Sequence, residues 1–253
     1  MKKSGLIYLA VFIYILSAFT GIQPDQKISI AAAANLNVAL DSMVSVYKLQ
    51  NPGAEVLVVY GSSGKLFEQI SNDAPFDLFF SADMNYPNKL KENNLAISDV
   101  KKYAEGQLVI WSKKMDPKIQ KMNSLLDAGI HKISVANPVT APYGEKAIES
   151  LKYYKLYDKI EDKLVYGENI SQAAQFVTSG AADIGIIALS LALTPNMLKE
   201  NGNYYVIPQE SHKPLEQGCV ILKHAKGNSS ALKFYSFVSS TSALKILKYF
   251  GYN

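Results

Sequence analysis

The chain has 253 residues, of which 48% are hydrophobic and 19% are charged, and its formal net charge is +4. This length and composition are enough for one large or two small buried cores. The basic residues form no stripe with interleaved aromatic residues, which disfavours nucleic-acid binding. All 26 of them are lysine, so the chain has no guanidinium group that could hold an anion by two hydrogen bonds.

The first 26 residues have the pattern of a secretory signal peptide. Lys2 and Lys3 form a charged start, residues 6–16 are an unbroken apolar run, and mostly small or polar residues follow. Because the run is too short to span a bilayer comfortably, we predict a signal peptide over residues 1–26 and a periplasmic mature protein. An uncleaved membrane anchor is the alternative. No cysteine lies nearby, which argues against a lipid anchor at this point.

The segment from residue 27 to residue 93 alternates between strand and helix patterns. Residues 27–32 alternate apolar and polar side chains, whereas apolar residues from Leu36 to Tyr47 recur at helical spacing until Asn51-Pro52-Gly53. Further strands are predicted at 56–60 and 77–81, and further helices around 66–70 and 86–93. This rhythm predicts a mostly parallel sheet with helices on both faces.

A second block with similar element lengths begins at residue 107. The predicted strands cover residues 107–112, 132–136, 164–166, 183–188, 204–207 and 218–223. The predicted helices cover 144–154, 170–177 and 230–250, the last with an interruption near Ser239-Ser240-Thr241. Two such α/β blocks indicate two lobes. Sheets of this kind bind ligands in the crevice beyond the carboxyl ends of their strands.

Four short segments each end a β-like run and begin a predicted helix with small or hydroxyl-bearing residues. They are residues 32–35 (AAAN), 60–64 (YGSSG), 141–144 (APYG) and 167–170 (GENI). A helix N-terminus offers unpaired N–H groups and a partial positive charge, which suits an anion. We predict that the four segments converge on one cleft and hold an oxyanion without a cationic side chain. Taken singly, each also fits an ordinary helix cap or turn.

The sequence offers little support for catalysis or for a resident metal. His131, His212 and His224 have no partner at metal-ligand spacing, and we expect them to be solvated surface residues. Neither a nucleophile-elbow pattern nor a phosphate-loop pattern is present. Cys219, the only cysteine, lies in an apolar run, where we expect a buried and inert thiol. We therefore expect no enzyme activity and no cofactor.

Longer segments around the four turns match a known family in the same order along the chain. The first half contains KISIAAAANLNVAL, VVYGSSGKLFEQI and APFDLFFSADM, and the second contains VANPVTAPYGEKAIESL, GENISQAAQFVTSGAADIGIIALS and the stretch from Ser239 to Tyr252. Together they resemble the periplasmic molybdate-binding proteins of ABC importers over nearly the whole mature chain. The resemblance implies an α/β, two-lobed solute-binding fold of type II, with the ligand in the cleft. Residues 27–106 and 219–253 are then expected in the first lobe and residues 107–218 in the second.

The resemblance also implies site residues. Asn35 falls where relatives use Ser or Asn to contact an oxyanion oxygen, and Ser63 matches the site serine of the second turn. Tyr143 falls where some members have a ligand-contacting tyrosine. Ile170 matches a position that contributes a backbone N–H.

Two further positions depart from the pattern of the family. Ala34 stands where some members have a threonine, so only its backbone is available. Ala188 stands where members that lack the first tyrosine carry one. The change looks compensatory, because one phenol is supplied by Tyr143 in place of position 188.

The resemblance implies a monomeric binding protein that captures molybdate or tungstate and delivers it to an ABC permease in the inner membrane. Molybdenum would be present only inside the bound oxyanion, without direct protein ligands. Selectivity against sulfate is expected from cavity size, since each donor that a smaller anion leaves unpaired costs about 1–3 kcal/mol. Three alternatives stay open: a binder of sulfate, thiosulfate or phosphate, an enzyme on the same fold, and a membrane-anchored adhesion or signalling domain.

Overall fold

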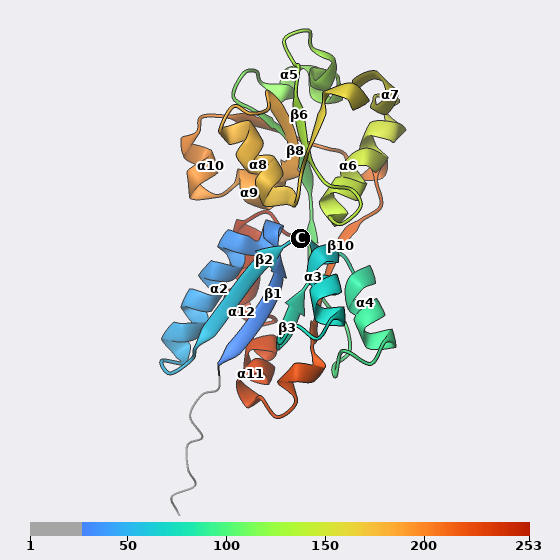
Figure 1. Cartoon of the computed structure of the whole chain (residues 1–253). Coiled ribbons are helices and arrows are strands. Elements are labelled where there is room, and N and C mark those ends of the chain that lie inside the picture. The colour runs from blue at the N-terminus through green and yellow to red at the C-terminus, as the bar shows by residue number, and fades with distance from the viewer. Residues whose placement is uncertain (1–26) are drawn as a thin grey trace, which may run out of the picture.

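The computed structural model describes residues 27–253, and the predicted signal peptide over residues 1–26 lies outside the described residues. The described chain folds into two α/β lobes, each built on a five-stranded sheet (Figure 1). The chain ends at the waist between the lobes, as the views from the front and from behind agree. The two-lobed α/β architecture predicted from the sequence is confirmed.

The sheet of the first lobe has the strand order β2-β1-β3-β10-β4. β1 runs parallel to β2 and β3, whereas β10 is antiparallel to β3 and β4. The sheet is therefore mixed, and its parallel part carries the first two predicted turns. The strands are β1 (Ile28–Ala33), β2 (Val56–Gly61), β3 (Leu78–Phe80), β4 (Lys101–Gly106) and β10 (Leu215–Ile221).

Helices cover both faces of this sheet, and the side chains of its strands alternate between the two faces. Ile30 and Leu78 pack in the apolar cluster that contains residues of α2, α11 and α12, whereas Ala31 and Phe79 pack in the cluster that contains residues of α3 and α4. Burial on both faces explains why the strands are continuous apolar runs. The helices are α2 (Asn37–Gln50), α3 (Ser63–Ser71), α4 (Asn85–Glu92), α11 (Ser229–Phe237) and α12 (Thr241–Tyr249).

The sheet of the second lobe has the strand order β7-β6-β8-β5-β9. β6 is parallel to β7 and β8, and β5 is antiparallel to β8 and β9, so this sheet is also mixed. Its strands are β5 (Leu108–Ser112), β6 (Ile133–Ala136), β7 (Leu164–Gly167), β8 (Ile184–Ala188) and β9 (Asn203–Val206). Its helices are α5 (Pro117–Gln120), α6 (Pro142–Tyr153), α7 (Tyr157–Ile160), α8 (Ile170–Thr178), α9 (Leu189–Ala192) and α10 (Pro195–Lys199).

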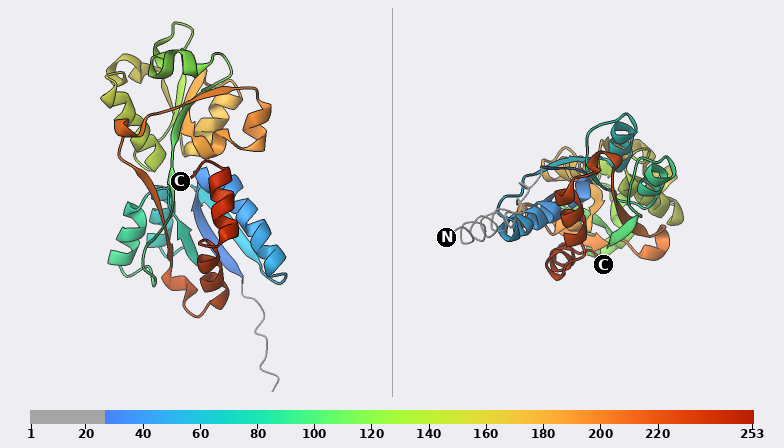
Figure 2. Two further views of the ribbon diagram at one scale, coloured as in Figure 1. Left: turned by 180° about the vertical axis from the view of Figure 1, so that it is seen from behind. Right: turned by 90° about the horizontal axis from the view of Figure 1, so that it is seen from below.

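The chain crosses between the lobes twice. β4 leads through Gln107 directly into β5, and the strap that follows β9 returns the chain to the first sheet as β10 (Figure 2). β10 begins at Leu215, and its residues 215–219 pair with β4, whereas the sequence placed the lobe boundary between residues 218 and 219. Short 3-10 turns complete the fold: η1 (Ala34–Leu36), η2 (Lys121–Leu126), η3 (Glu161–Lys163), η4 (Gln209–Ser211) and η5 (Lys223–Ala225).

The structure contains each predicted strand and each predicted helix, with ends shifted by a few residues. The predicted interruption of the closing helix is confirmed, because Ser240 Oγ accepts from the Ala243 N–H at 3.2 Å and starts α12. Cys219 is buried, and burial raises the pKa of its thiol to about 12, as expected for an inert cysteine. Within residues 27–253, no helix combines the length and the apolar character needed to cross a membrane.

Candidate functional site

A small cavity lies between the lobes, at the carboxyl ends of strands from both sheets. The empty space within it is about 190 Å³, including the part that is open to solvent. A cavity of this size suits only a compact ligand. Its lining residues are Ala33, Ala34, Asn35, Gly61, Ser62, Ser63, Ala82, Ala141, Pro142, Tyr143, Asn169 and Ile170.

Three α-helices begin at this cavity, one from the first lobe and two from the second. The first N–H groups of a helix have no partner within the helix and carry a partial positive charge. The residues before α3 and α6 make no capping side-chain bond, whereas Asn169 Oδ1 caps α8 by accepting from two backbone N–H groups of its first turn. The first helical residues are Ser63 in α3, Pro142 in α6 and Ile170 in α8.

All four predicted turns contribute lining residues, so they converge on one cavity as the sequence predicts. Five of the six predicted site residues line it, namely Ala34, Asn35, Ser63, Tyr143 and Ile170. Ala188 is not among the lining residues: it ends β8, is fully buried and precedes α9. Contact between any of these residues and an oxyanion stays a prediction.

Two adjacent serines differ in their hydrogen bonding. Ser63 Oγ accepts from the Ala82 N–H at 3.0 Å, and its own hydrogen is available for a ligand. Ser62 Oγ is buried and has no hydrogen-bond partner among the described residues. Because an unpaired buried hydroxyl costs free energy, Ser62 is a second candidate donor to a ligand. The sequence reasoning assigned only Ser63, since pairing of a hydroxyl is a property of the folded structure.

Asn35 is tied to parts of the chain that the sequence gave no reason to place beside it. Its Nδ2 donates to Gln217 Oε1 at 3.0 Å and to Tyr252 Oη at 2.8 Å. Its Oδ1 is buried without a partner among the described residues. Its backbone oxygen accepts from Tyr252 Oη and from Ser190 Oγ, both at 2.9 Å. Gln217 and Tyr252 are thus polar neighbours of the cavity that the sequence reasoning missed.

The side chains of Tyr103, Tyr143 and Tyr252 are buried near Gln217, beside the cavity. Tyr143 Oη accepts from Gln217 Nε2 at 3.0 Å, and Tyr103 Oη lies 2.8 Å from Gln217 Oε1. Burial raises the pKa of Tyr103, Tyr143 and Tyr252 above the ordinary value for tyrosine. All three phenols therefore stay protonated at neutral pH and keep their hydrogen-bond donors.

Hydrogen bonds join the two lobes around the cavity. The Gly64 N–H donates to Thr140 O at 2.8 Å, and a Cβ on Gly64 would lie 2.9 Å from that oxygen, so glycine permits this close approach. On another side, Ser171 Oγ donates to Ala34 O at 2.9 Å. These contacts hold the helix N-termini of both lobes against one small space.

The residues that line the cavity, all within the described chain, include no charged side chain. Lys65 lies in the first turn of α3, but its Nζ is paired with Glu168 of the second lobe at 2.8 Å, and both side chains are about half exposed. Residues 27–253 contain no group of three or more His, Cys, Asp and Glu side chains that could hold a metal ion.

All three histidines are expected from the sequence to be surface residues, and the structure agrees for two of them. His131 and His224 are exposed, although His224 Nδ1 lies 3.2 Å from Asp77 Oδ1. The expectation for His212 is wrong: its side chain is buried, because it lies in the strap between β9 and β10 where η4 packs against α6. Its Nδ1 lies 2.8 Å from Lys213 O.

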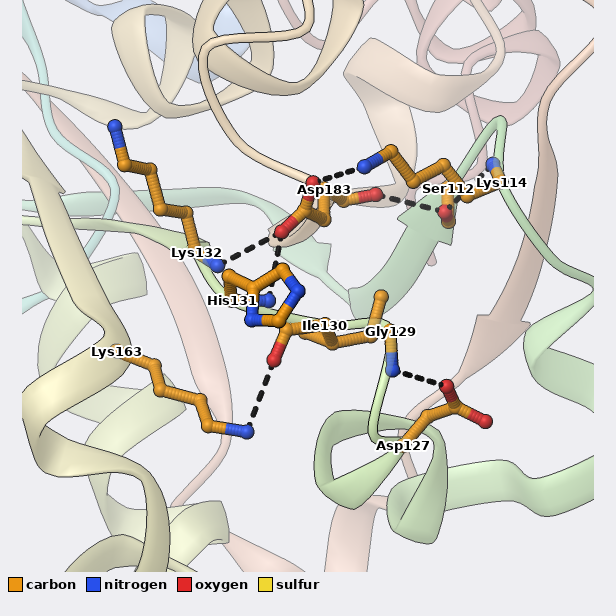
Figure 3. A network of polar contacts seen from close by, with 9 residues as sticks. All are labelled: Ser112, Lys114, Asp127, Gly129, Ile130, His131, Lys132, Lys163 and Asp183. Carbon is orange, nitrogen blue, oxygen red and sulfur yellow. Dashed lines mark hydrogen bonds and ion pairs between the residues drawn. The ribbon is translucent and has the colours of Figure 1, made fainter.

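A strongly held carboxylate belongs to the framework of the second lobe and not to the cavity (Figure 3). Asp183 precedes β8 and so lies at the end of that strand opposite to Ala188. Its Oδ2 accepts from the backbone N–H groups of His131 and Lys132 at 2.7 and 2.9 Å, and its Oδ1 pairs with Lys114. Burial alone would raise the pKa of this carboxyl, but these hydrogen bonds outweigh it and hold the pKa at about 2.

Two α/β lobes joined by two crossings, with helix N-termini surrounding a small cavity between them, define a solute-binding protein. A family model for bacterial extracellular solute-binding proteins matches residues 28–253. The molybdate-binding protein ModA of Rhodobacter capsulatus is 34% identical over 225 residues, covering 88% of this chain and 86% of that protein. ModA of Azotobacter vinelandii is 33% identical over 228 residues, covering 89% of each.

The comparison of structures agrees with the comparison of sequences. The periplasmic molybdate-binding protein of Azotobacter vinelandii superimposes with a TM-score of 0.83 and 31% sequence identity, covering 89% of this chain and 98% of that one. The chain belongs to the bacterial extracellular solute-binding protein family and, within it, to the family of the ModA proteins.

Proposed function

We propose that this protein captures molybdate or tungstate in the periplasm, as a monomer, and delivers it to an ABC permease. The observation that carries the proposal is the cavity between the lobes, whose lining combines helix N-termini and hydroxyl groups with no charged side chain among the described residues. The names of the relatives that share about a third of this sequence support the choice of ligand.

In the proposed complex, the oxyanion is held by neutral donors from both lobes. Ser62 and Ser63 contribute hydroxyl groups, and the start of α8 at Ile170 and that of α6 at Tyr143 contribute backbone N–H groups. Ala34 and Asn35 contribute backbone from the first lobe. Ala188, which does not line the cavity, has no part in this set.

Neutral donors can hold a dianion provided that every oxygen is paired, because desolvation of an unpaired charge is costly. A rigid ring of donors then selects by size. An anion smaller than molybdate leaves some donors unpaired, and each costs about 1–3 kcal/mol. We therefore expect sulfate to bind less tightly than molybdate by about tenfold or more.

The test is calorimetric titration of the purified protein with molybdate, tungstate and sulfate in turn. We expect tight binding of at least one of the first two and much weaker binding of sulfate. Sulfate binding as tight as that of molybdate would refute the assignment in favour of a general tetrahedral-oxyanion binder.

An enzyme on the same fold is the second candidate, and the lining offers little for it. The only titratable side chain among the described lining residues is Tyr143, whose pKa is raised by burial. A group of this kind does not exchange a proton readily near neutral pH. We therefore expect molybdate affinity to stay nearly flat between about pH 6 and 8, the range in which a histidine would titrate.

A further inference from the structure

Gln217 is a fully buried polar residue between the lobes that none of the predicted roles uses. Its side chain joins Asn35 of the first lobe to Tyr143 of the second: Oε1 accepts from Asn35 Nδ2 at 3.0 Å and Nε2 donates to Tyr143 Oη at 3.0 Å. Asn35 and Tyr143 both line the cavity. Gln217 therefore contacts the site from behind, through one residue of each lobe.

The local backbone is shaped around this contact. The pairing of β10 with β4 is interrupted by a register shift at Gln217, which leaves Tyr103 as the extra residue of β4. Bulges of this kind re-aim side chains next to functional sites. A Cβ on Gly106 would lie 2.1 Å from Tyr143 Oη and 2.6 Å from Gln217 Nε2, so only glycine at that position leaves room for the hydrogen bond.

With the Asn35 and Gln217 amides oriented as in the structure, two groups of this cluster do not have one hydrogen-bond partner each. Asn35 Oδ1 has no partner, and the single hydrogen of Tyr103 Oη faces two acceptors, Ser81 O at 3.1 Å and Gln217 Oε1 at 2.8 Å. An oxyanion beside Asn35 would also be repelled by the unpaired Oδ1, because an amide oxygen only accepts hydrogen bonds.

Turning both amides end for end removes these conflicts together. Gln217 Nε2 then donates to Asn35 Oδ1 and to Tyr103 Oη, which frees the Tyr103 hydrogen for Ser81 O. Tyr143 Oη donates to Gln217 Oε1. The Tyr252 hydroxyl donates to Asn35 Oδ1, and the backbone oxygen of Asn35 keeps its bond from Ser190, the last member of this network. Every group of the cluster is then paired within the protein except Asn35 Nδ2, which takes the place of the unpaired Oδ1.

The turned arrangement also changes what the cavity presents. Asn35 Nδ2 now occupies the place of the unpaired Oδ1 and offers an N–H to a ligand. The Tyr143 hydrogen is used by Gln217 and is no longer available. The two orientations thus differ in which cavity residue can donate to the oxyanion, Tyr143 or Asn35. The orientation of the Gln217 amide determines which of the two it is.

We propose that Gln217 is a positioning residue of the oxyanion site, which turns together with Asn35 when the anion binds and holds the Asn35 amide with its N–H toward the ligand. This inference rests on the proposed function and adds to it the residue that orients one donor. In the bound state Asn35 contacts the ligand through its side chain, whereas Tyr143 contacts Gln217.

The first test is calorimetry with molybdate on four variants of the purified protein: Gln217→Met, Asn35→Ala, the double variant and Tyr143→Phe. We expect Gln217→Met, which keeps the shape and loses both hydrogen-bonding ends, to weaken binding by about tenfold or more. In an Asn35→Ala background the same substitution should weaken binding by less than about threefold, because its effect passes through Asn35. Tyr143→Phe should cost less affinity than Gln217→Met. Independent losses from Gln217→Met and Asn35→Ala, or a larger loss from Tyr143→Phe, would overturn the proposal.

A second variant separates positioning from a merely structural role. In Gln217→Glu the ionised carboxylate only accepts hydrogen bonds, so it holds Asn35 Nδ2 away from the ligand. Because position 217 is fully buried, the pKa of a carboxyl there is raised, and we expect it to take up a proton as the pH falls from 8 to 6. The protonated side chain has one donor and one acceptor, so molybdate affinity should recover over this range while that of the unmodified protein stays flat. A Gln217→Glu affinity that does not change with pH would contradict the proposal.

Two controls make the results interpretable. Glu216→Gln changes the neighbouring, half-exposed residue of the same strand and should leave the affinity unaltered. Thermal unfolding of each variant without ligand confirms that it is folded. If the unmodified protein itself fails to bind molybdate, the proposed function fails. If it binds and Gln217→Met binds equally well, only the role of Gln217 is lost.

Discussion

Substituting the two adjacent serines of the cavity, one at a time, tests the site most directly. Both hydroxyls are buried and both residues line the cavity. Only Ser63 Oγ has a protein partner, the Ala82 N–H at 3.0 Å, whereas Ser62 Oγ has none among the described residues. Ser62→Ala and Ser63→Ala therefore make a matched pair that differs in the hydrogen bond lost from the protein.

The magnitudes follow from this difference. A hydrogen bond to a charged partner contributes about 1.5–3 kcal/mol, so either substitution should weaken molybdate binding by about 10- to 100-fold. Ser63→Ala also leaves the buried Ala82 N–H unpaired, which should lower the free energy of unfolding without ligand by about 1–3 kcal/mol. Ser62→Ala removes an unpaired hydroxyl and should leave that free energy unchanged or slightly higher.

Calorimetry with molybdate and thermal unfolding without ligand measure the two effects. For a chain of this size about 1 kcal/mol corresponds to a change of about 2–4 °C in the melting temperature, so only Ser63→Ala should show a clear drop. Equal melting temperatures in the two variants would refute the hydrogen-bond assignment of Ser63. Unchanged molybdate affinity in both would remove these hydroxyls from the proposed site.

Three further predictions concern the framework, the back of the cavity and its rim. Asp183→Asn should lower the free energy of unfolding at pH 7 by about 2 kcal/mol, because the folded pKa of about 2 lies below the ordinary value of 3.8. This stabilisation is present above pH 3.8 and is lost as the pH falls toward 2. Unfolding curves of the two proteins, measured at decreasing pH, should therefore converge. Gly106→Ala should destabilise the protein by about 1–3 kcal/mol and weaken molybdate binding, since the new methyl group overlaps the contact between Tyr143 and Gln217. A variant with unaltered melting temperature and affinity would contradict this close packing around Gly106. Lys65→Gln breaks an exposed interlobe ion pair and should weaken molybdate binding by less than about fivefold, whereas a loss as large as that of Ser62→Ala in the same titration would mean that a lysine holds the anion.

The sequence predicted the parts of this molecule that depend on local patterns. The strands of both sheets have apolar runs bounded by turns, and the turns at AAAN, YGSSG, APYG and GENI lead into helices as expected. Their convergence on one cavity follows from topology, because the carboxyl ends of parallel strands meet at one edge of a sheet. β4 was missed because only Tyr103, Ala104 and Gly106 of its residues are buried, so its pattern is weak.

The sequence could not predict the polar residues behind the cavity. Gln217 lies 182 residues from Asn35, and Tyr252 lies 217 residues from it, so no local spacing relates them. Gln217 also follows the exposed Glu216 in the sequence, and two consecutive polar residues there predict a solvent-exposed strand end. Only the fold shows that β10 returns to the first lobe beside Tyr103 and buries this side chain completely. The same limit explains His212, whose burial depends on the strap between the lobes.

The proposed use of neutral donors from two lobes would tie capture of the ligand to lobe closure. In the proposed site, the donors at Ser62 and Ser63 belong to the first lobe and those at Tyr143 and Ile170 to the second, so this site would be complete only when the lobes meet. A ligand shifts such an equilibrium only through contacts that one state has and the other lacks, and here most of the contacts are of that kind. When the lobes part, water can pair the freed N–H and hydroxyl groups at little cost, whereas a buried lysine–oxyanion pair would have to be separated against strong attraction. A protein that must release its cargo to a permease is therefore better served by amides and hydroxyls than by charged side chains.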